Sequence, residues 1–186
     1  MRLNLIVLLI TCLLGAGVTY LLDGNSHPDI TDTNPASEKI SGSQIPDFSF
    51  IDLQGKKHNI TDFAGQTILL NFWATWCAPC VIEFPKLIQL AITHPDITLI
   101  ALSSDTTDDA VSKFLKKNKK PIPKNMMIAR DAKGHITADI FGTYKLPETL
   151  IISPSGKMVK KIVGDTDWTS KEINDFLTAV QSSEQE

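Results

Sequence analysis

Cysteine is scarce in this chain: only three of the 186 residues are cysteines, at positions 12, 77 and 80. Small domains that depend on a disulfide scaffold use many more, so the core has to come from apolar packing, for which an apolar content of 42% suffices. A basic excess is also missing, because the net charge is −3, and we expect no nucleic-acid partner. No second Cys or His pair with ligand spacing accompanies Cys77 and Cys80, so we expect no metal site.

One long apolar run lies at the N-terminus. Residues 3–22 follow Met1-Arg2 and carry no charge, and ~20 apolar residues are about the length of a membrane-spanning helix. A cleavable signal peptide is the alternative, but no small-x-small site follows the run, so residues 1–22 are predicted to be an uncleaved anchor. With the positive N-terminal side in the cytoplasm, the sequence predicts a single-pass protein of a bacterial inner membrane with its soluble part in the periplasm or another extracytoplasmic space.

The rest of the chain divides into a linker, one domain and a tail. Residues 23–44 are polar and rich in Asp, Asn, Ser, Thr and Pro, which is typical of a flexible linker. A domain is predicted over residues 45–182, followed by a short tail at 183–186. Residues 48–60 predict a β-hairpin around a Gly turn that extends the domain at its N-terminal end.

Strand and helix patterns alternate after the predicted hairpin. Strands are expected at 68–73, 97–103, 126–129, 149–152 and 158–163, and helices at 78–92, about 106–117, 136–141 and about 170–181. The second helix is expected to be capped by Asp105 or Thr106, and the last to open with a capping box from Thr169 to Glu172. This order indicates an α/β fold with helices on both faces of a sheet.

Cys77 and Cys80 lie two residues apart where a predicted strand turns into a helix. The free N–H groups and the positive dipole end of a helix N-terminus favour a thiolate. Cys80 is in the first turn, close enough to form a small disulfide, and this arrangement is typical of thiol–disulfide exchange. Cys77 is the predicted nucleophile and Cys80 the less exposed resolving thiol. A static structural disulfide is the alternative, although so short a loop would stabilise the fold only weakly.

A resemblance rests on the segment from Asn71 to Cys80, N-F-W-A-T-W-C-A-P-C, together with Glu83-Phe84-Pro85. It resembles the membrane-anchored, extracytoplasmic thioredoxin-like proteins of the TlpA, ResA and CcmG (DsbE) type, over about residues 45–177. The resemblance implies a thioredoxin fold, with a central mixed sheet flanked by helices, and reduction of protein disulfides. Typical substrates are the C-x-x-C-H haem sites of apocytochromes c, and a membrane thiol donor of the CcdA or DsbD type supplies the electrons. We expect no cofactor beyond the redox-active Cys77–Cys80 pair.

Glu83 is the predicted acid–base residue. It lies three residues after Cys80 on the same helix face, where a carboxylate can exchange a proton with the sulfur if apolar surroundings such as Phe84 raise its pKa. Thioredoxin has a buried Asp in the preceding strand, whereas this chain has Asn71, which cannot titrate. The resembling family keeps a Glu at position 83. A solvated helix carboxylate is the alternative.

Three further residues are predicted to bind substrate: Trp76, Leu146 and Pro147. Leu146-Pro147 precedes an apolar strand, and the resemblance implies a cis bond there, packed opposite the disulfide, with the backbone before the proline pairing with an extended substrate. Trp76 is expected on the exposed docking surface and Trp73 in the core. Glu148 is predicted either to bring charge to the site or to lie on the surface.

The sequence between the two cysteines favours a reductase. An oxidase such as DsbA has a His there, which stabilises the reduced thiolate, whereas this chain has Ala78-Pro79. In the predicted reaction Cys77 attacks a substrate disulfide, and Cys80 then resolves the mixed disulfide with help from Glu83. A general periplasmic disulfide reductase, isomerase or oxidase is the alternative, and a non-catalytic binding, chaperone or metal-handling domain is less favoured. The P-x-x-x-T-x-x-C context of a peroxidase is absent.

Overall fold

The computed structural model describes residues 42–118 and 120–182. The predicted anchor at 1–22, most of the linker at 23–44 and the tail at 183–186 lie outside these residues. Within the described part, none of the helices combines the length and the apolar character that a membrane crossing needs.

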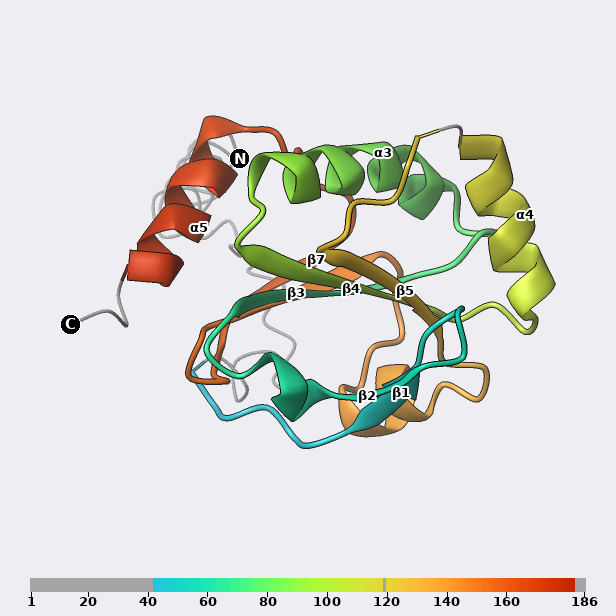
Figure 1. The fold of residues 1–186 in the computed structure, drawn as a ribbon, viewed down its shortest axis with the longest axis horizontal. Coiled ribbons are helices and arrows are strands. Elements are labelled where there is room, and N and C mark those ends of the chain that lie inside the picture. Colours follow the sequence, from blue (N-terminus) through green and yellow to red (C-terminus); the bar gives the residue numbers. More distant parts are fainter. Residues whose placement is uncertain (1–41, 119, 183–186) are drawn as a thin grey trace, which may run out of the picture. The chain divides into compact units, whose positions relative to one another are not determined.

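A five-stranded mixed sheet forms the centre of the domain, in the order β5-β4-β3-β6-β7 (Figure 1). β3, β4 and β5 run parallel, and β6 is antiparallel to both β3 and β7. All residues of β3 and β4 are buried because both faces of these strands are covered, and most of their side chains are accordingly apolar. The strands are β3 (Thr67–Trp73), β4 (Ile97–Ser103), β5 (Met126–Arg130), β6 (Glu148–Ile152) and β7 (Met158–Val163).

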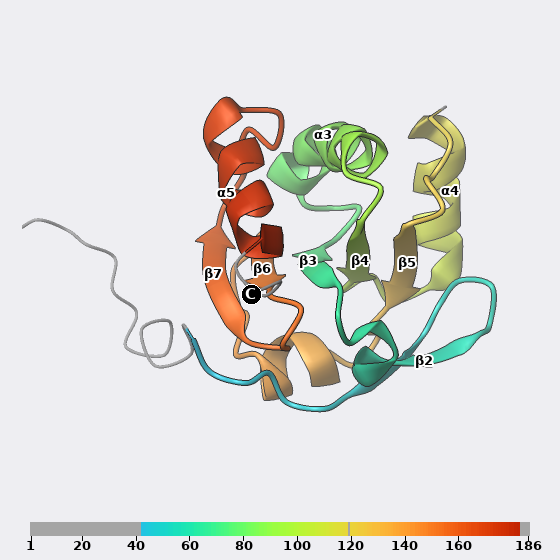
Figure 2. The same ribbon diagram turned by 60° about the vertical axis from the view of Figure 1, so that its left-hand side comes forward.

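Helices and a hairpin cover the two faces of this sheet. The three long helices α3, α4 and α5 lie on one face, and the hairpin β1-β2 with the short helices η1 and η2 lies on the other (Figures 1 and 2). The predicted hairpin, the five strands and the helices on both faces are therefore confirmed. The elements are α3 (Ala78–Thr93), α4 (Asp108–Asn118), α5 (Lys171–Ser182), β1 (Ser49–Ile51), β2 (Lys57–Asn59), η1 (Ile60–Phe63) and the π-type η2 (His135–Ile140).

Strand alternation divides the core into two layers. Leu69 and Trp73 of β3 pack into the cluster on the side of α3, whereas Leu70 and Phe72 pack into the cluster on the hairpin side. Trp73 is 1% exposed, which confirms its predicted place in the core. Asn71 has the same parity as Leu69 and Trp73, so it points into the layer that holds the active-site helix.

The two predicted helix caps are wrong by one or two residues. Thr107 caps α4, where its hydroxyl oxygen accepts from the N–H of Ala110 at 3.3 Å. Asp105 is instead buried, because other donors bind its carboxylate (see below). Ser170 caps α5 and accepts from the N–H of Ile173 at 3.3 Å, one residue later than the predicted capping box.

Candidate redox-active site

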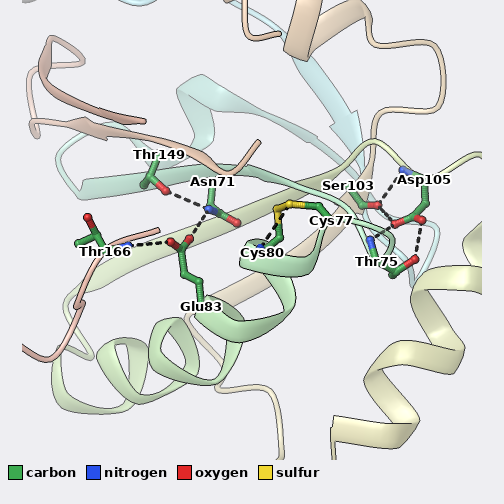
Figure 3. The surroundings of a disulfide bond; sticks show 9 residues. All are labelled: Asn71, Thr75, Cys77, Cys80, Glu83, Ser103, Asp105, Thr149 and Thr166. Carbon is green, nitrogen blue, oxygen red and sulfur yellow. Dashed lines mark hydrogen bonds between the residues drawn. A yellow bond between two sulfur atoms is a disulfide. The ribbon is translucent and has the colours of Figure 1, made fainter. Parts of the chain in front are cut away.

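The two cysteines lie where β3 gives way to α3, and Cys77 is the N-cap residue of that helix. They form a disulfide with Cα atoms 5.3 Å apart (Figure 3). The backbone N–H of Cys80 donates to Cys77 Sγ at 3.3 Å, so the helix N-terminus is directed at this sulfur and favours its thiolate after reduction. Cys77 is 7% exposed and Cys80 2%, the order expected for nucleophile and resolving thiol.

A buried carboxylate fixes the turn before the nucleophile. Asp105 is 2% exposed and follows the C-terminal end of β4. Its Oδ2 accepts from the Thr75 backbone N–H at 2.9 Å and from the Ser103 hydroxyl at 2.6 Å, and its Oδ1 accepts from the Thr75 hydroxyl at 2.7 Å. Figure 3 shows this group beside Cys77. The sequence analysis identified Asp105 only as a helix cap, although a Ser-x-Asp at the end of a buried strand is a signal for such a turn.

Glu83 is buried one helical turn after Cys80, with 1% of its surface exposed. Asn71 Nδ2 donates to its Oε1 and the Thr166 backbone N–H to its Oε2, both at 3.2 Å. Burial raises the pKa of Glu83 to about 7, and the nearby charge of Asp165 adds to this effect, while Trp168, Thr166 and Asn71 oppose it. The Trp168 N–H favours the carboxylate form of Glu83, although it makes no regular hydrogen bond. The alternative of a solvated helix carboxylate is wrong.

Asn71 joins three elements behind the disulfide. Besides its bond to Glu83 on α3, its Nδ2 donates to the Thr149 hydroxyl of β6 at 2.9 Å. Asn71 is fully buried, and Figure 3 shows its carboxamide between Thr149, Glu83 and the disulfide. Because Asn71 is uncharged, the ionisable group of this layer is on the helix and not on the strand.

The Leu146–Pro147 peptide bond is cis, as the resemblance implied. The carbonyl oxygen of Pro147 accepts from the N–H of Gly164 at 2.8 Å. Phe72, near the end of β3, pairs with Glu148 at the start of β6, so Pro147 and the cysteine-bearing turn lie at the same edge of the sheet.

Two aromatic side chains near this edge are exposed. Trp76 is 68% exposed next to the nucleophile, in line with its expected place on the surface, and Tyr144 is 79% exposed in the loop that leads to Pro147. The sequence analysis did not single out Tyr144. An exposed apolar side chain beside a reactive disulfide is suited to contact a protein substrate.

Of the two predictions for Glu148, the surface position is wrong. Glu148 is 4% exposed, and its Oε1 lies 3.0 Å from Lys161 Nζ on β7. The Thr143 hydroxyl donates to the same carboxylate oxygen. The Glu148 charge is therefore compensated inside the protein and is not offered to a ligand. The sequence analysis missed Lys161 and Thr143, although two adjacent lysines in a strand signal that one of them points inward.

The described residues contain no group of three or more His, Cys, Asp and Glu side chains that could hold a metal ion. The absence of a cofactor stays a prediction.

The fold and the site together define a thioredoxin-like protein with a redox-active C-x-x-C disulfide. Residues 40–180 match the Redoxin family, and the chain belongs to it. It is 34% identical over 141 residues to the thiol-disulfide oxidoreductase ResA of Bacillus thuringiensis subsp. konkukian. This match covers 75% of this chain and 78% of the relative. It is 31% identical over 150 residues to ResA of Bacillus subtilis, and that match covers 79% of this chain and 80% of the relative.

A solved structure shows the same relationship. A Chlorobium tepidum protein assigned as the thiol:disulfide interchange protein DsbE superposes with a TM-score of 0.67 at 26% identity, over 76% of this chain and 98% of that one. The chain is accordingly a thiol-disulfide oxidoreductase of the ResA/DsbE type.

Proposed function

We propose that this protein reduces protein disulfides outside the cytoplasm, held at a bacterial inner membrane by residues 1–22. The observation that carries the proposal is the Cys77–Cys80 disulfide at the N-terminus of α3, with the carboxyl group of Glu83 buried behind it. No His lies between the cysteines to stabilise a thiolate, which favours a reductase. The Cys77–Cys80 pair is the redox group, and no cofactor takes part.

In the proposed reaction Cys77, as a thiolate, attacks one sulfur of a substrate disulfide. The bond between Cys77 and that sulfur forms, the substrate S–S bond breaks, and the released substrate thiolate takes up a proton. Cys80 then gives its proton to Glu83 and attacks Cys77 Sγ. The internal disulfide forms, the mixed disulfide breaks, and the second substrate sulfur leaves as a thiolate. This thiolate takes up a proton from solvent, and Glu83 gives its own proton back to solvent, so two electrons and two protons pass to the substrate.

Glu83 suits this proton transfer because its pKa is about 7. A general base works best when its pKa lies near the working pH, since it then accepts and returns a proton with little cost. Glu83 and Cys80 are three residues apart on α3, a spacing that brings side chains together on a helix surface.

The substrate is proposed to bind along the cis-proline loop. The backbone before Pro147, at Leu146, pairs with an extended substrate segment, and the exposed Trp76 contacts it from the other side of the nucleophile. The favoured client is the oxidised C-x-x-C-H site of an apocytochrome c. A membrane thiol donor of the CcdA or DsbD type then reduces Cys77–Cys80 again.

Trapping of the mixed disulfide tests this proposal. In the full-length Cys80→Ala protein the intermediate on Cys77 cannot be resolved, so substrates should accumulate as adducts that a reductant releases. The matched Cys77→Ala protein should trap far less. Adducts with apocytochromes c support the favoured client, a wide set of extracytoplasmic proteins supports a general reductase, and no adduct in cells contradicts both.

The reduction potential distinguishes a reductase from an oxidase. Equilibration with glutathione buffers should give a value near that of thioredoxin, about −270 mV, whereas a value near that of DsbA, about −120 mV, would contradict the proposed direction.

A further inference from the structure

A buried ion pair lies directly behind the cis-proline loop. Glu148 Oε1 and Lys161 Nζ are 3.0 Å apart, and their side chains are only 5% and 7% exposed. Glu148 pairs with Val163 and Leu150 with Lys161 across β6 and β7, so the two charged residues are diagonal neighbours on one face. Leu150 belongs to the core layer on the hairpin side, so this ion pair faces away from Asn71 and the active-site helix.

Stability alone is a poor explanation for this pair. Removing two charges from water is costly, and well-packed apolar residues of similar size often serve the fold as well or better. A buried pair does, however, fix the relative position of the two segments that carry it. Here one partner is the residue that immediately follows Pro147.

A third residue connects the pair to the loop itself. The Thr143 hydroxyl donates to the same oxygen of Glu148, and the Thr143 backbone N–H donates to the Thr137 carbonyl oxygen at 2.8 Å. Beyond the loop, the Pro147 carbonyl oxygen accepts from Gly164 at 2.8 Å. The segment Tyr144–Pro147 is therefore fastened at both ends, and its first residue is 79% exposed.

We propose that Glu148, Lys161 and Thr143, the Glu148 cluster, are positioning residues that hold the segment Tyr144–Pro147 in place for protein substrates. This inference rests on the proposed function, in which the backbone before Pro147 pairs with the substrate. An extended polypeptide can pair with this backbone beside Cys77 only if the backbone keeps a fixed position and direction. A small disulfide meets only the sulfur atoms, so it does not depend on the Glu148 cluster.

Two variants test the proposal without leaving a buried charge unpaired. Thr143→Val replaces the hydroxyl by a methyl group of similar size, and the double variant Glu148→Gln/Lys161→Met removes both charges at nearly constant volume. Lys160→Met is the matched control, because Lys160 is the neighbouring lysine of β7 but lies over the Phe176 ring, 4.7 Å from its centre, away from the Glu148 cluster.

The kinetic readout compares insulin with oxidised glutathione, using the purified full-length chain. For both test variants we expect KM for insulin to rise about tenfold, the effect of roughly one lost hydrogen bond, with kcat changed less than twofold. The rate with oxidised glutathione and the reduction potential should follow those of the control. An unchanged KM for insulin, or an equal loss on both substrates, would overturn the proposal.

Hydrogen exchange provides a readout that is independent of the direction of electron transfer. Amide exchange at Tyr144, Lys145 and Leu146 should accelerate in both test variants and stay unchanged in Lys160→Met. If the protein proves to be an oxidase, this acceleration still supports the Glu148 cluster while the proposed function fails. If exchange at these amides stays as in the parent protein, the Glu148 cluster does not position the segment, whatever the reaction.

Discussion

Glu83 and Glu148 are both almost fully buried near the disulfide, with 1% and 4% of their surfaces exposed. Their binding partners nevertheless differ. Glu83 accepts from neutral donors, the Asn71 carboxamide and a backbone N–H. Glu148 has the Lys161 ammonium group 3.0 Å away. The first carboxyl group lies in the layer of α3, the second in the layer of the hairpin.

This difference matches the two roles proposed for these carboxyl groups, proton exchange for Glu83 and positioning of the substrate-binding segment for Glu148. Neutral donors offset only part of the cost of burying a charge, and burial raises the pKa of Glu83 to about 7. A cation at hydrogen-bonding distance compensates the charge of Glu148 in place. The buried lysine is thus the main difference between the surroundings of the two glutamates.

Removing the lysine should have the largest effect. Lys161→Met leaves Glu148 buried without its cation, and breaking a buried pair in this way costs about 3–5 kcal/mol. Urea unfolding of the oxidised protein should show this loss. Because Glu148→Gln also removes the second charge, the double variant should regain most of the stability. A single variant as stable as the parent protein would mean that the two charges are not coupled.

The pH dependence of stability should report the raised pKa of Glu83. Its pKa is raised from 4.5 to about 7 in the folded protein, so the folded state holds the proton more tightly than the unfolded state. The contribution of Glu83 to the free energy of unfolding is therefore greatest below pH 4.5 and is lost as the pH rises through 7. The loss should reach about 3 kcal/mol.

Glu83→Gln should remove this pH-dependent step, because the amide cannot take up the proton. The measurement is the free energy of unfolding of the oxidised protein at several pH values between 4 and 9, compared with the parent at each pH. A step that survives in Glu83→Gln would assign the titration to another group.

Local sequence was sufficient to predict the place of one of these two glutamates, Glu83, beside Cys80. Glu83 follows Cys80 by three residues on a helix, and helix geometry alone places the two side chains on one face. Burial of both faces likewise made β3 and β4 recognisable as apolar runs. The cis bond at Pro147, by contrast, was predicted from the resemblance.

Contacts between distant strands could not be predicted in the same way. The pairing of Glu148 with Lys161 depends on the register of two antiparallel strands, and a shift by one residue would have turned the other lysine, Lys160, inward. Asp105 has the residue type and position of a helix cap, but Thr75, 30 residues earlier, binds its carboxylate. In both cases the partner is set by tertiary structure and not by the neighbouring sequence.

Asp105 is a third buried carboxylate, and like Glu83 it is held by neutral donors, here hydroxyl and backbone groups. Asp105→Ala leaves the Thr75 N–H and two hydroxyl groups without their acceptor, so we expect a loss of about 1–3 kcal/mol in urea unfolding and a changed alkylation rate of reduced Cys77. Asp105→Asn keeps an acceptor oxygen and should lose less. Equal losses in the two variants would show that the charge, and not the hydrogen bonds, fixes the turn.

Trp76→Ala should have the smallest effect on stability. It tests substrate contact at Trp76 without changing Glu83 or Glu148. The side chain is 68% exposed, so its loss should change the free energy of unfolding by no more than about 0.5 kcal/mol. If Trp76 contacts the substrate, KM for insulin should still rise by about threefold, less than for the Glu148 cluster because the backbone of the docking segment stays in place. Ile92→Ala is the matched control, since Ile92 is 54% exposed in the last turn of α3, at the other end of that helix from Trp76 and the cysteines. A similar rise in both variants would mean that the effect comes from lost apolar surface in general and not from contact beside the nucleophile.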